Sequence, residues 1–142
     1  MQEKIYNQTL KMLSKDKNYY LLIGYGSIAK KHITIIKKND PASIVYIYIK
    51  NKKIINDLKV KKFIFTLDHD FIKKINFVYV LSPSTSHKYY LDFFIKYKHL
   101  KIFIEKPLFN RVVNDNFSNS KYFKNSRRIF IGYNMRYMEN LK

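Results

Sequence analysis

The chain has 142 residues, 46% of them hydrophobic, and a formal net charge of +18 from 28 Lys and Arg against 10 Asp and Glu. This length and hydrophobic share indicate one folded domain with a core and argue against a disordered chain. The absence of cysteine excludes disulfides, thiolate nucleophiles and Cys-ligated metals, and no apolar run reaches the roughly 20 residues that span a bilayer.

The positive charge has two possible meanings. Cations that neutralise phosphates favour nucleic-acid binding. However, the basic residues are mostly Lys, and they occur in pairs scattered along the chain in a composition rich in Ile, Asn and Tyr. This scatter indicates solvated faces, so a nucleic-acid-binding protein is the less favoured alternative. The polar N-terminus lacks the features of a signal peptide, which predicts a cytoplasmic location.

The first predicted element is an amphipathic helix over residues 2–17, treated as an N-terminal extension of residues 1–18 that leans on a sheet edge. Residues 19–142 form the predicted main domain, in which strands and helices alternate. The predicted strands are 19–23, 44–49, 63–65, 77–81, 101–104 and 129–133, and the predicted helices are 27–38, 53–58, 68–75 and 86–98. Residues 114–126 are polar and give a poor helix signal. This alternation predicts an α/β fold with a doubly wound parallel sheet, the three-layer Rossmann fold.

Two predicted helices carry apolar faces that we expect to pack on this sheet. For the helix 27–38 the expected buried residues are Ile28, Ile33, Ile35 and Ile36, and for the helix 86–98 they are Tyr90, Phe93, Phe94 and Tyr97.

Two of the three glycines lie between the first strand and the first helix, in Gly24-Tyr25-Gly26-Ser27-Ile28-Ala29. Such a strand, turn and helix is typical of dinucleotide-binding folds. Gly24 would form the turn, and Gly26 would let the backbone approach a pyrophosphate at the helix N-terminus. Ala29 would permit close packing of helix on strand. An ordinary tight turn can contain the same pair of glycines, so the remaining motifs must distinguish it from a dinucleotide-binding turn.

Further unusual residues follow the other predicted strands. Ligands of open parallel sheets bind beyond the carboxyl ends of the strands, so residues that follow different strands converge there. These residues are Lys50 after the second strand, Ser82, Pro83 and His87 after the fourth, Glu105, Lys106 and Pro107 after the fifth, and Asn134 and Arg136 after the sixth. The sequence therefore predicts a binding site at this edge.

Four motifs, in their order and spacing, resemble the N-terminal NAD(P)-binding domain of the Gfo/Idh/MocA oxidoreductases over residues 19–137. They are the glycine turn, Val78-Tyr79-Val80-Leu81-Ser82-Pro83 with His87, Glu105-Lys106-Pro107, and Gly132-Tyr133-Asn134-Met135-Arg136-Tyr137. The resemblance implies a dinucleotide cofactor and a sugar, sugar nucleotide or polyol as substrate.

The resemblance also implies roles for individual residues. Lys106 would contact the reacting hydroxyl or carbonyl, where an ammonium stabilises developing alkoxide charge. Glu105 would orient Lys106 or contact the cofactor, and Pro107 would fix the turn through a cis bond. The implied cofactor-binding residues are Gly24, Tyr25, Gly26, Ser27, Ile28, Lys50, Ser82, Pro83, His87, Glu105 and Arg136. The alternatives are a surface lysine at position 106 and a helix-capping histidine at position 87.

Two departures from the family pattern matter. Lys50 stands where an acidic residue usually holds the ribose of NAD, which favours NADP over NAD. The alternative is that Lys50 only reflects the lysine-rich composition and that cofactor binding has been lost. The chain ends at Lys142, where family members continue into a second domain that supplies a Lys-x-x-Asp-x-x-x-His helix. We therefore expect an incomplete catalyst with an exposed apolar sheet face. That face would favour homo-oligomers or a separate chain that supplies the second domain. The alternative is a non-catalytic binding or regulatory relative.

Overall fold

The computed structural model describes residues 17–50, 62–108 and 120–132. Its strands are β1 (Tyr19–Ile23), β2 (Ile44–Tyr48), β3 (Phe63–Ile64), β4 (Phe77–Val80), β5 (Lys101–Glu105) and β6 (Ile129–Gly132). Its helices are α2 (Ser27–Asn39), α3 (His69–Ile72), α4 (His87–Phe94) and α5 (Lys121–Lys124), with 3-10 turns η2 (Ser84–Ser86) and η4 (Ser126–Arg128). The helices predicted over 2–17 and 53–58, and the residues Asn134 and Arg136, lie outside the described residues.

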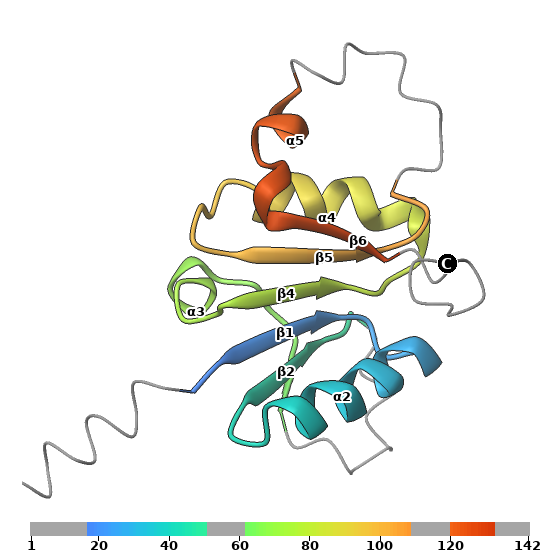
Figure 1. Cartoon of the computed structure of the whole chain (residues 1–142), viewed down its shortest axis with the longest axis vertical. Coiled ribbons are helices and arrows are strands. Elements are labelled where there is room, and N and C mark those ends of the chain that lie inside the picture. The colour runs from blue at the N-terminus through green and yellow to red at the C-terminus, as the bar shows by residue number, and fades with distance from the viewer. Residues whose placement is uncertain (1–16, 51–61, 109–119, 133–142) are drawn as a thin grey trace, which may run out of the picture.

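All six strands join one parallel sheet in the order β3-β2-β1-β4-β5-β6 (Figure 1). The order reverses at β1, because the chain moves outward to β2 and β3 and then returns to β4 on the other side. This confirms the predicted doubly wound Rossmann fold. The carboxyl ends of β1 and β4, which lie next to each other, mark the point of reversal.

Helices cover the two faces of the sheet unequally. On one face, α2 buries Ala29 and Ile36 against Leu22, Val45 and Ile47 of β1 and β2. On the opposite face, the larger core cluster contains residues of α4 and the inward side chains of β1, β4 and β5, namely Tyr90, Leu91, Phe94, Leu21, Ile23, Val78, Val80, Ile102 and Ile104. α2 therefore covers the β1–β2 half of its face.

The prediction that Ile35 is buried on the apolar face of α2 is wrong. This residue is 53% exposed, whereas Ile36 is buried and Ile28 and Ile33 are partly buried. Successive residues of a helix point about 100° apart, so Ile35 and Ile36 lie on different sides of α2. Because α2 packs on two strands, only the side with Ile36 faces the sheet. In α4 the predicted Tyr90 and Phe94 are buried and Phe93 is partly buried. The helix ends at Phe94, before the predicted residue 98, and Tyr97 is buried in the segment that follows it.

A short helix, α5, occurs near the end of the polar stretch 114–126, whose sequence pattern does not predict one. The Ser120 hydroxyl caps α5 by accepting a hydrogen bond from the Phe123 amide at 3.3 Å. Asp92 of α4 anchors this helix, since it accepts hydrogen bonds from Tyr122 (2.6 Å) and pairs with Lys121 (2.9 Å). Local polar contacts thus stabilise an element with little apolar periodicity.

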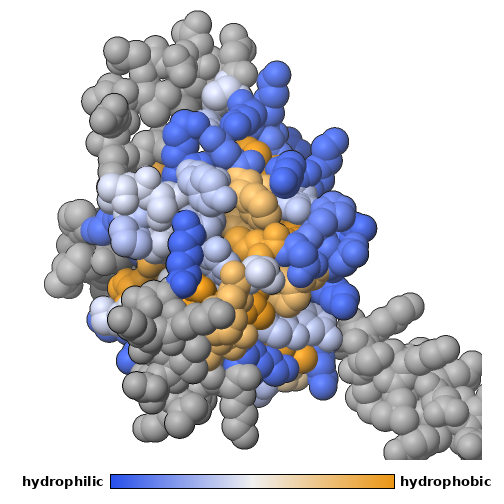
Figure 2. Space-filling model, turned by 180° about the vertical axis from the view of Figure 1, so that it is seen from behind, coloured by the Kyte–Doolittle hydropathy of each residue, from blue (hydrophilic) through white to orange (hydrophobic). Residues whose placement is uncertain are grey.

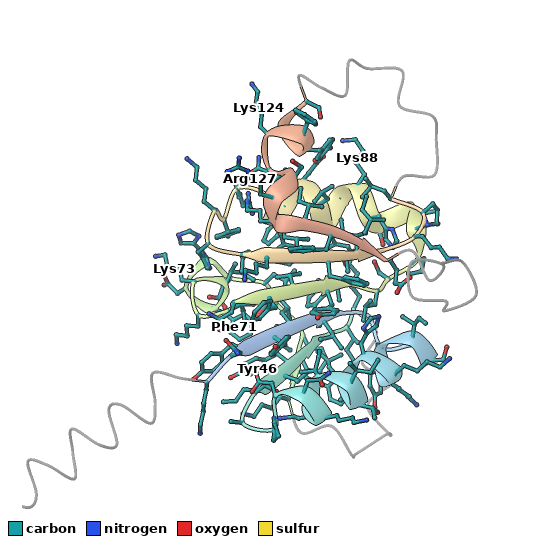
Figure 3. The ribbon with its side chains drawn as sticks, viewed as in Figure 1. Tyr46, Phe71, Lys73, Lys88, Lys124 and Arg127 are labelled. Carbon is teal, nitrogen blue, oxygen red and sulfur yellow. The ribbon has the colours of Figure 1, made fainter. Side chains whose placement is uncertain are left out.

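Arg128 ties η4 to the end of α4. Its guanidinium donates to the carbonyl oxygens of Tyr97 (3.1 Å), Leu100 (3.3 Å) and Ile95. Arg127 beside it is exposed, and Figure 3 shows it among the charged side chains that project from the molecule. On the other half of the sheet, the ring of Phe71 meets Tyr46 edge to face at 5.0 Å (Figure 3).

Hydrophilic side chains are distributed widely over the surface, around an apolar centre on the side shown in Figure 2. This distribution matches the scatter of lysines along the sequence. Within the described ranges, no helix is long and apolar enough to cross a membrane.

Candidate functional site

The first glycine of the turn has a backbone that other residues resist. Gly24 has a φ of 99°, and its amide donates to the carbonyl of Tyr48 at 3.0 Å, which ties the ends of β1 and β2 together. A Cβ at this position would lie 3.3 Å from the backbone of Leu81 and Ser82. Both the φ angle and the close approach of the loop after β4 therefore require glycine here.

The second glycine has open space around it. Gly26 is the N-cap of α2 with extended backbone (φ −89°, ψ −171°), and a Cβ there would meet nothing within 4 Å. The amides of the first turn of a helix lack intrahelical acceptors and carry partial positive charge. No acidic residue occupies the first turn of α2, and Ser27 is exposed. An anion can therefore approach this end of α2, which lies at the point where the strand order reverses.

The loop after β4 closes the other side of this reversal point. The Leu81 amide donates to the carbonyl of Ile23 at 3.0 Å, so the loop begins beside the glycine turn. The hydroxyls of Ser82 and Ser86 lie 2.7 Å apart, and Ser86 also donates to the carbonyl of Pro83 at 2.8 Å. The structure thus brings Ser82 close to the glycine turn, as the topology predicts, and Pro83 follows it in the same loop.

His87 is buried with 1% of its surface exposed. Its Nε2 lies 2.8 Å from the carbonyl oxygen of Ser82, and its Nδ1 lies 2.8 Å from that of Pro107. The ring therefore links the loop after β4 to the turn after β5. Contact with the cofactor stays a prediction for this residue, and both ring nitrogens already face backbone atoms.

The turn after β5 contains the predicted catalytic lysine. Lys106 is exposed, and the Lys106–Pro107 peptide bond is cis, in agreement with the expectation for Pro107. Glu105 points to the α2 face, where its carboxylate lies 3.3 Å from Nε2 of His32. The two roles expected of Glu105, to orient Lys106 or to contact the cofactor, stay predictions. His32 was not among the predicted site residues.

Lys50 lies two residues after β2 and reaches across to α4. Its Nζ lies 5.6 Å from the ring centre of Tyr89 and 5.9 Å from that of Tyr90. Burial raises the pKa of Tyr90 to about 12, with a further contribution from the neighbouring Tyr48 and Tyr89. A neutral Tyr90 phenol therefore lies beside the exposed side chain of Lys50.

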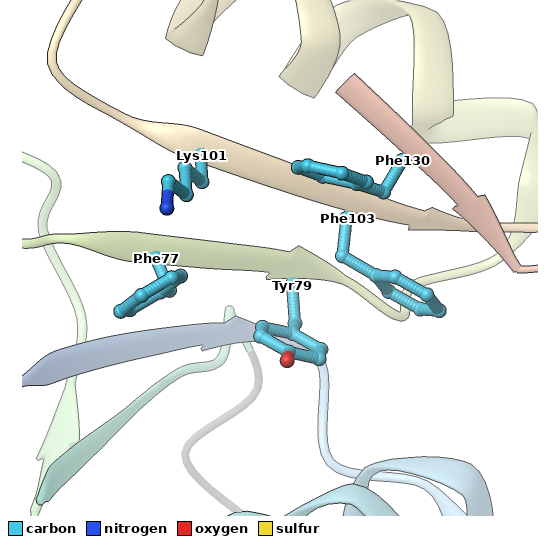
Figure 4. A pocket seen from close by; sticks show the side chains of 5 residues that line it. All are labelled: Phe77, Tyr79, Lys101, Phe103 and Phe130. Carbon is cyan, nitrogen blue, oxygen red and sulfur yellow. The ribbon is translucent and has the colours of Figure 1, made fainter. Parts of the chain in front are cut away.

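An aromatic groove lies on the α2 face of β4, β5 and β6. It encloses about 280 Å³ and is lined by Phe77, Tyr79, Lys101, Phe103 and Phe130, whose side chains rise from neighbouring strands (Figure 4). Phe130 is 49% exposed. An apolar sheet face is thus present in the described part of the chain, as expected, while what covers it stays a prediction.

A glycine turn that opens into a helix N-terminus at the reversal point of a doubly wound parallel sheet defines a dinucleotide-binding Rossmann domain. Residues 19–132 match the model of the Gfo/Idh/MocA family, described as "Oxidoreductase family, NAD-binding Rossmann fold". The chain belongs to the Gfo/Idh/MocA oxidoreductase family. No curated protein matches it.

Solved structures of dehydrogenases and oxidoreductases share the fold. A dehydrogenase (MviM) from Clostridium difficile is 22% identical with a TM-score of 0.64, and the match covers 84% of this chain and 40% of that one. A Gfo/Idh/MocA family oxidoreductase from Vibrio cholerae is 20% identical with a TM-score of 0.63, covering 84% and 39%. The WlbA (WbpB) dehydrogenase from Thermus thermophilus, in complex with NAD and UDP-GlcNAcA, is 17% identical with a TM-score of 0.64, covering 87% and 44%. The chain therefore spans less than half the length of these proteins.

Proposed function

We propose that this chain binds NAD(P) at the glycine turn and is the cofactor-binding part of an oxidoreductase. The observation that carries the proposal is the contrast between the two glycines. Gly24 is required by its own backbone and by the adjacent loop, whereas Gly26 is surrounded by open space at the N-terminus of α2. Folding alone explains the first glycine, and a ligand that needs close backbone approach explains the second.

The residues present fit a dinucleotide. The pyrophosphate would lie at the N-terminus of α2, next to Gly26 and Ser27, because amides there supply hydrogen bonds and positive charge. Ser82 and Pro83 would border the cofactor from the loop after β4. When bound, the dinucleotide supplies a carrier for hydride. The chain itself holds and orients that carrier.

In this proposal Lys106 contacts the substrate. Its side chain is exposed in the turn after β5, and an ammonium at this place stabilises negative charge that develops on a substrate oxygen. The substrate class is a sugar, sugar nucleotide or polyol, supported by the WlbA relative, whose structure contains UDP-GlcNAcA. A homo-oligomer or a separate polypeptide that covers the aromatic groove of β4, β5 and β6 belongs to the same proposal.

We also propose that the cofactor is NADP rather than NAD. Lys50 is exposed beyond the end of β2, where a carboxylate would repel a 2′-phosphate and an ammonium attracts it. The Lys50→Asp variant should shift the preference from NADPH towards NADH. The ratio of the NADPH to the NADH dissociation constant should rise by about tenfold or more, measured by the change in nicotinamide fluorescence on binding. An unchanged ratio would show that Lys50 does not contact the ribose.

Thermal unfolding tests cofactor binding. At 100 times its dissociation constant, NADPH should stabilise the fold by about 2.7 kcal/mol, which corresponds to a rise in Tm of roughly 8 °C. Inorganic tripolyphosphate at the same ionic strength is the matched control, because a chain of charge +18 attracts polyanions without specificity. Equal shifts with both compounds, or no shift with NADPH, would refute the proposal.

A further inference from the structure

His32 and Glu105 form a pair that joins two separate parts of the site. His32 lies in α2, whose N-terminus carries the glycine turn, and Glu105 is the last residue of β5, directly before Lys106. The pair is 73 residues apart in sequence, and its atoms Nε2 and Oε1 lie 3.3 Å apart. It therefore spans β4, the strand that separates β5 from β1 in the sheet.

The surroundings of the pair restrict its geometry. The ring of His32 meets Tyr79 at 5.3 Å and Phe103 at 5.1 Å, both edge to face. The side chains of His32 and Glu105 are only 19% and 16% exposed. A hydrogen bond to a carboxylate that is shielded from water in this way is stronger than one at an open surface.

Gly132 of β6 leaves room for the Glu105 side chain. It lies opposite Glu105 in the parallel register of β5 and β6. A Cβ at Gly132 would lie 2.7 Å from Cζ of Phe103 and 3.1 Å from Oε1 of Glu105, so any larger residue would displace the ring or the carboxylate. Three elements, α2, β5 and β6, thus fix the position of one carboxylate.

We propose that His32 is a positioning residue that fixes Glu105, and through it the turn with Lys106, relative to the helix that holds the dinucleotide. This inference rests on the proposed function because it takes α2 and Lys106 as parts of one site. Cofactor binding at α2 and the placement of Lys106 are then coupled through the pair. Replacement of the histidine disturbs cofactor affinity although its side chain lies on the α2 face, away from the pyrophosphate.

The test compares NADPH dissociation constants of single and double variants. His32→Leu and Glu105→Leu should each raise the dissociation constant about fivefold, and the double variant should be no worse than either single one, because both remove the same interaction. His32→Gln keeps a hydrogen-bond donor and should bind within about twofold of the parent chain. Gly132→Ala should weaken binding as well, by displacing the carboxylate from β6.

His69→Leu is the matched control. His69 lies on α3, contacts the Tyr97 hydroxyl at 3.2 Å and meets its ring at 5.3 Å, so its loss removes a similar polar and aromatic contact elsewhere. It should change Tm but not the NADPH dissociation constant. If His32→Leu lowers Tm and leaves the dissociation constant unchanged, or if His69→Leu weakens binding equally, the inference is wrong.

A second measurement separates this inference from cofactor binding itself. Amide hydrogen exchange of the cofactor-free chain should be at least about threefold faster at Glu105, Lys106 and Leu108 in His32→Leu, with exchange in β1 unchanged. Unchanged exchange at these three amides would overturn the positioning role. Failure of the parent chain to bind NADPH would instead refute the proposed function, while the exchange result would still decide the role of His32.

Discussion

Replacing Gly26 by Asp should separate folding from binding. A Cβ at Gly26 would meet no atom within 4 Å, and the backbone already has the extended conformation of an N-cap residue. Aspartate is a preferred N-cap residue, and its charge is favourable at a helix N-terminus. We therefore expect the variant to gain about 0.5 kcal/mol in the free energy of unfolding, measured by urea denaturation without cofactor.

The same substitution should abolish useful cofactor affinity. A carboxylate about 5 Å from a pyrophosphate charge in an environment of effective dielectric constant about 20 costs about 3 kcal/mol, which raises the dissociation constant about 100-fold. Gly26→Asn has nearly the same shape and capping ability without the charge, so it should weaken binding by a smaller factor. Ala42→Asp, at an exposed position after the C-terminal end of α2, controls for the change in net charge.

Two results would refute this reasoning. If Gly26→Asp destabilises the cofactor-free chain by more than about 1 kcal/mol, the space beside the glycine is not open as the structure indicates. If the variant binds NADPH as tightly as the parent chain, the pyrophosphate does not lie at the N-terminus of α2.

Further substitutions test other parts of the structure. Gly24→Ala should lower the free energy of unfolding by about 2 kcal/mol in urea titrations, because φ is 99° and backbone atoms lie 3.3 Å from the new Cβ; unchanged stability would contradict this backbone. Burial alone would raise the pKa of Asp92, but hydrogen bonds from lysines and a tyrosine lower it to about 2. Because its pKa is lower in the folded than in the unfolded chain, ionised Asp92 adds about 1 kcal/mol to the free energy of unfolding above pH 4. This contribution is lost as the pH falls from about 4 to 2. The stability difference between the parent and Asp92→Asn should therefore vanish over that interval in acid denaturation, and a difference independent of pH would contradict the assignment. Arg128→Ala should cost about 2 kcal/mol and lower Tm by roughly 6 °C, since three carbonyls lose their donor. Arg127→Ala, at an exposed position, should be nearly neutral, and equal effects of the two would contradict the role of Arg128.

The strands could be predicted from the sequence because their signal is local. Apolar, β-branched and aromatic runs such as Ile44–Tyr48 are typical of parallel strands covered on both faces. Their boundaries agree within one or two residues with the structure. The placement of the glycine turn beside Ser82 followed from topology, because the carboxyl ends of parallel strands meet at one edge.

Other features depend on packing that no local pattern contains. A single histidine in the lysine-rich helix α2 carries no signal for a partner 73 residues away, so His32 could not be assigned to Glu105. The exposure of Ile35 depends on how much of the sheet α2 covers, and the helix itself looks amphipathic over a wider face. Helix α5 owes its position to Ser120 and Asp92, whose contacts exist only after folding.

Residue-resolved NMR during titration with NADPH tests the central claim most directly. Binding at the glycine turn predicts saturable shifts of the Gly24, Gly26, Ser27 and Ser82 amides at the carboxyl edge of the sheet. Tripolyphosphate at equal concentration should shift these amides much less, because it lacks the adenosine and nicotinamide groups that also contact this edge of the sheet. If NADPH shifts none of these amides, or perturbs only scattered surface lysines as tripolyphosphate does, the chain does not hold a dinucleotide at this site.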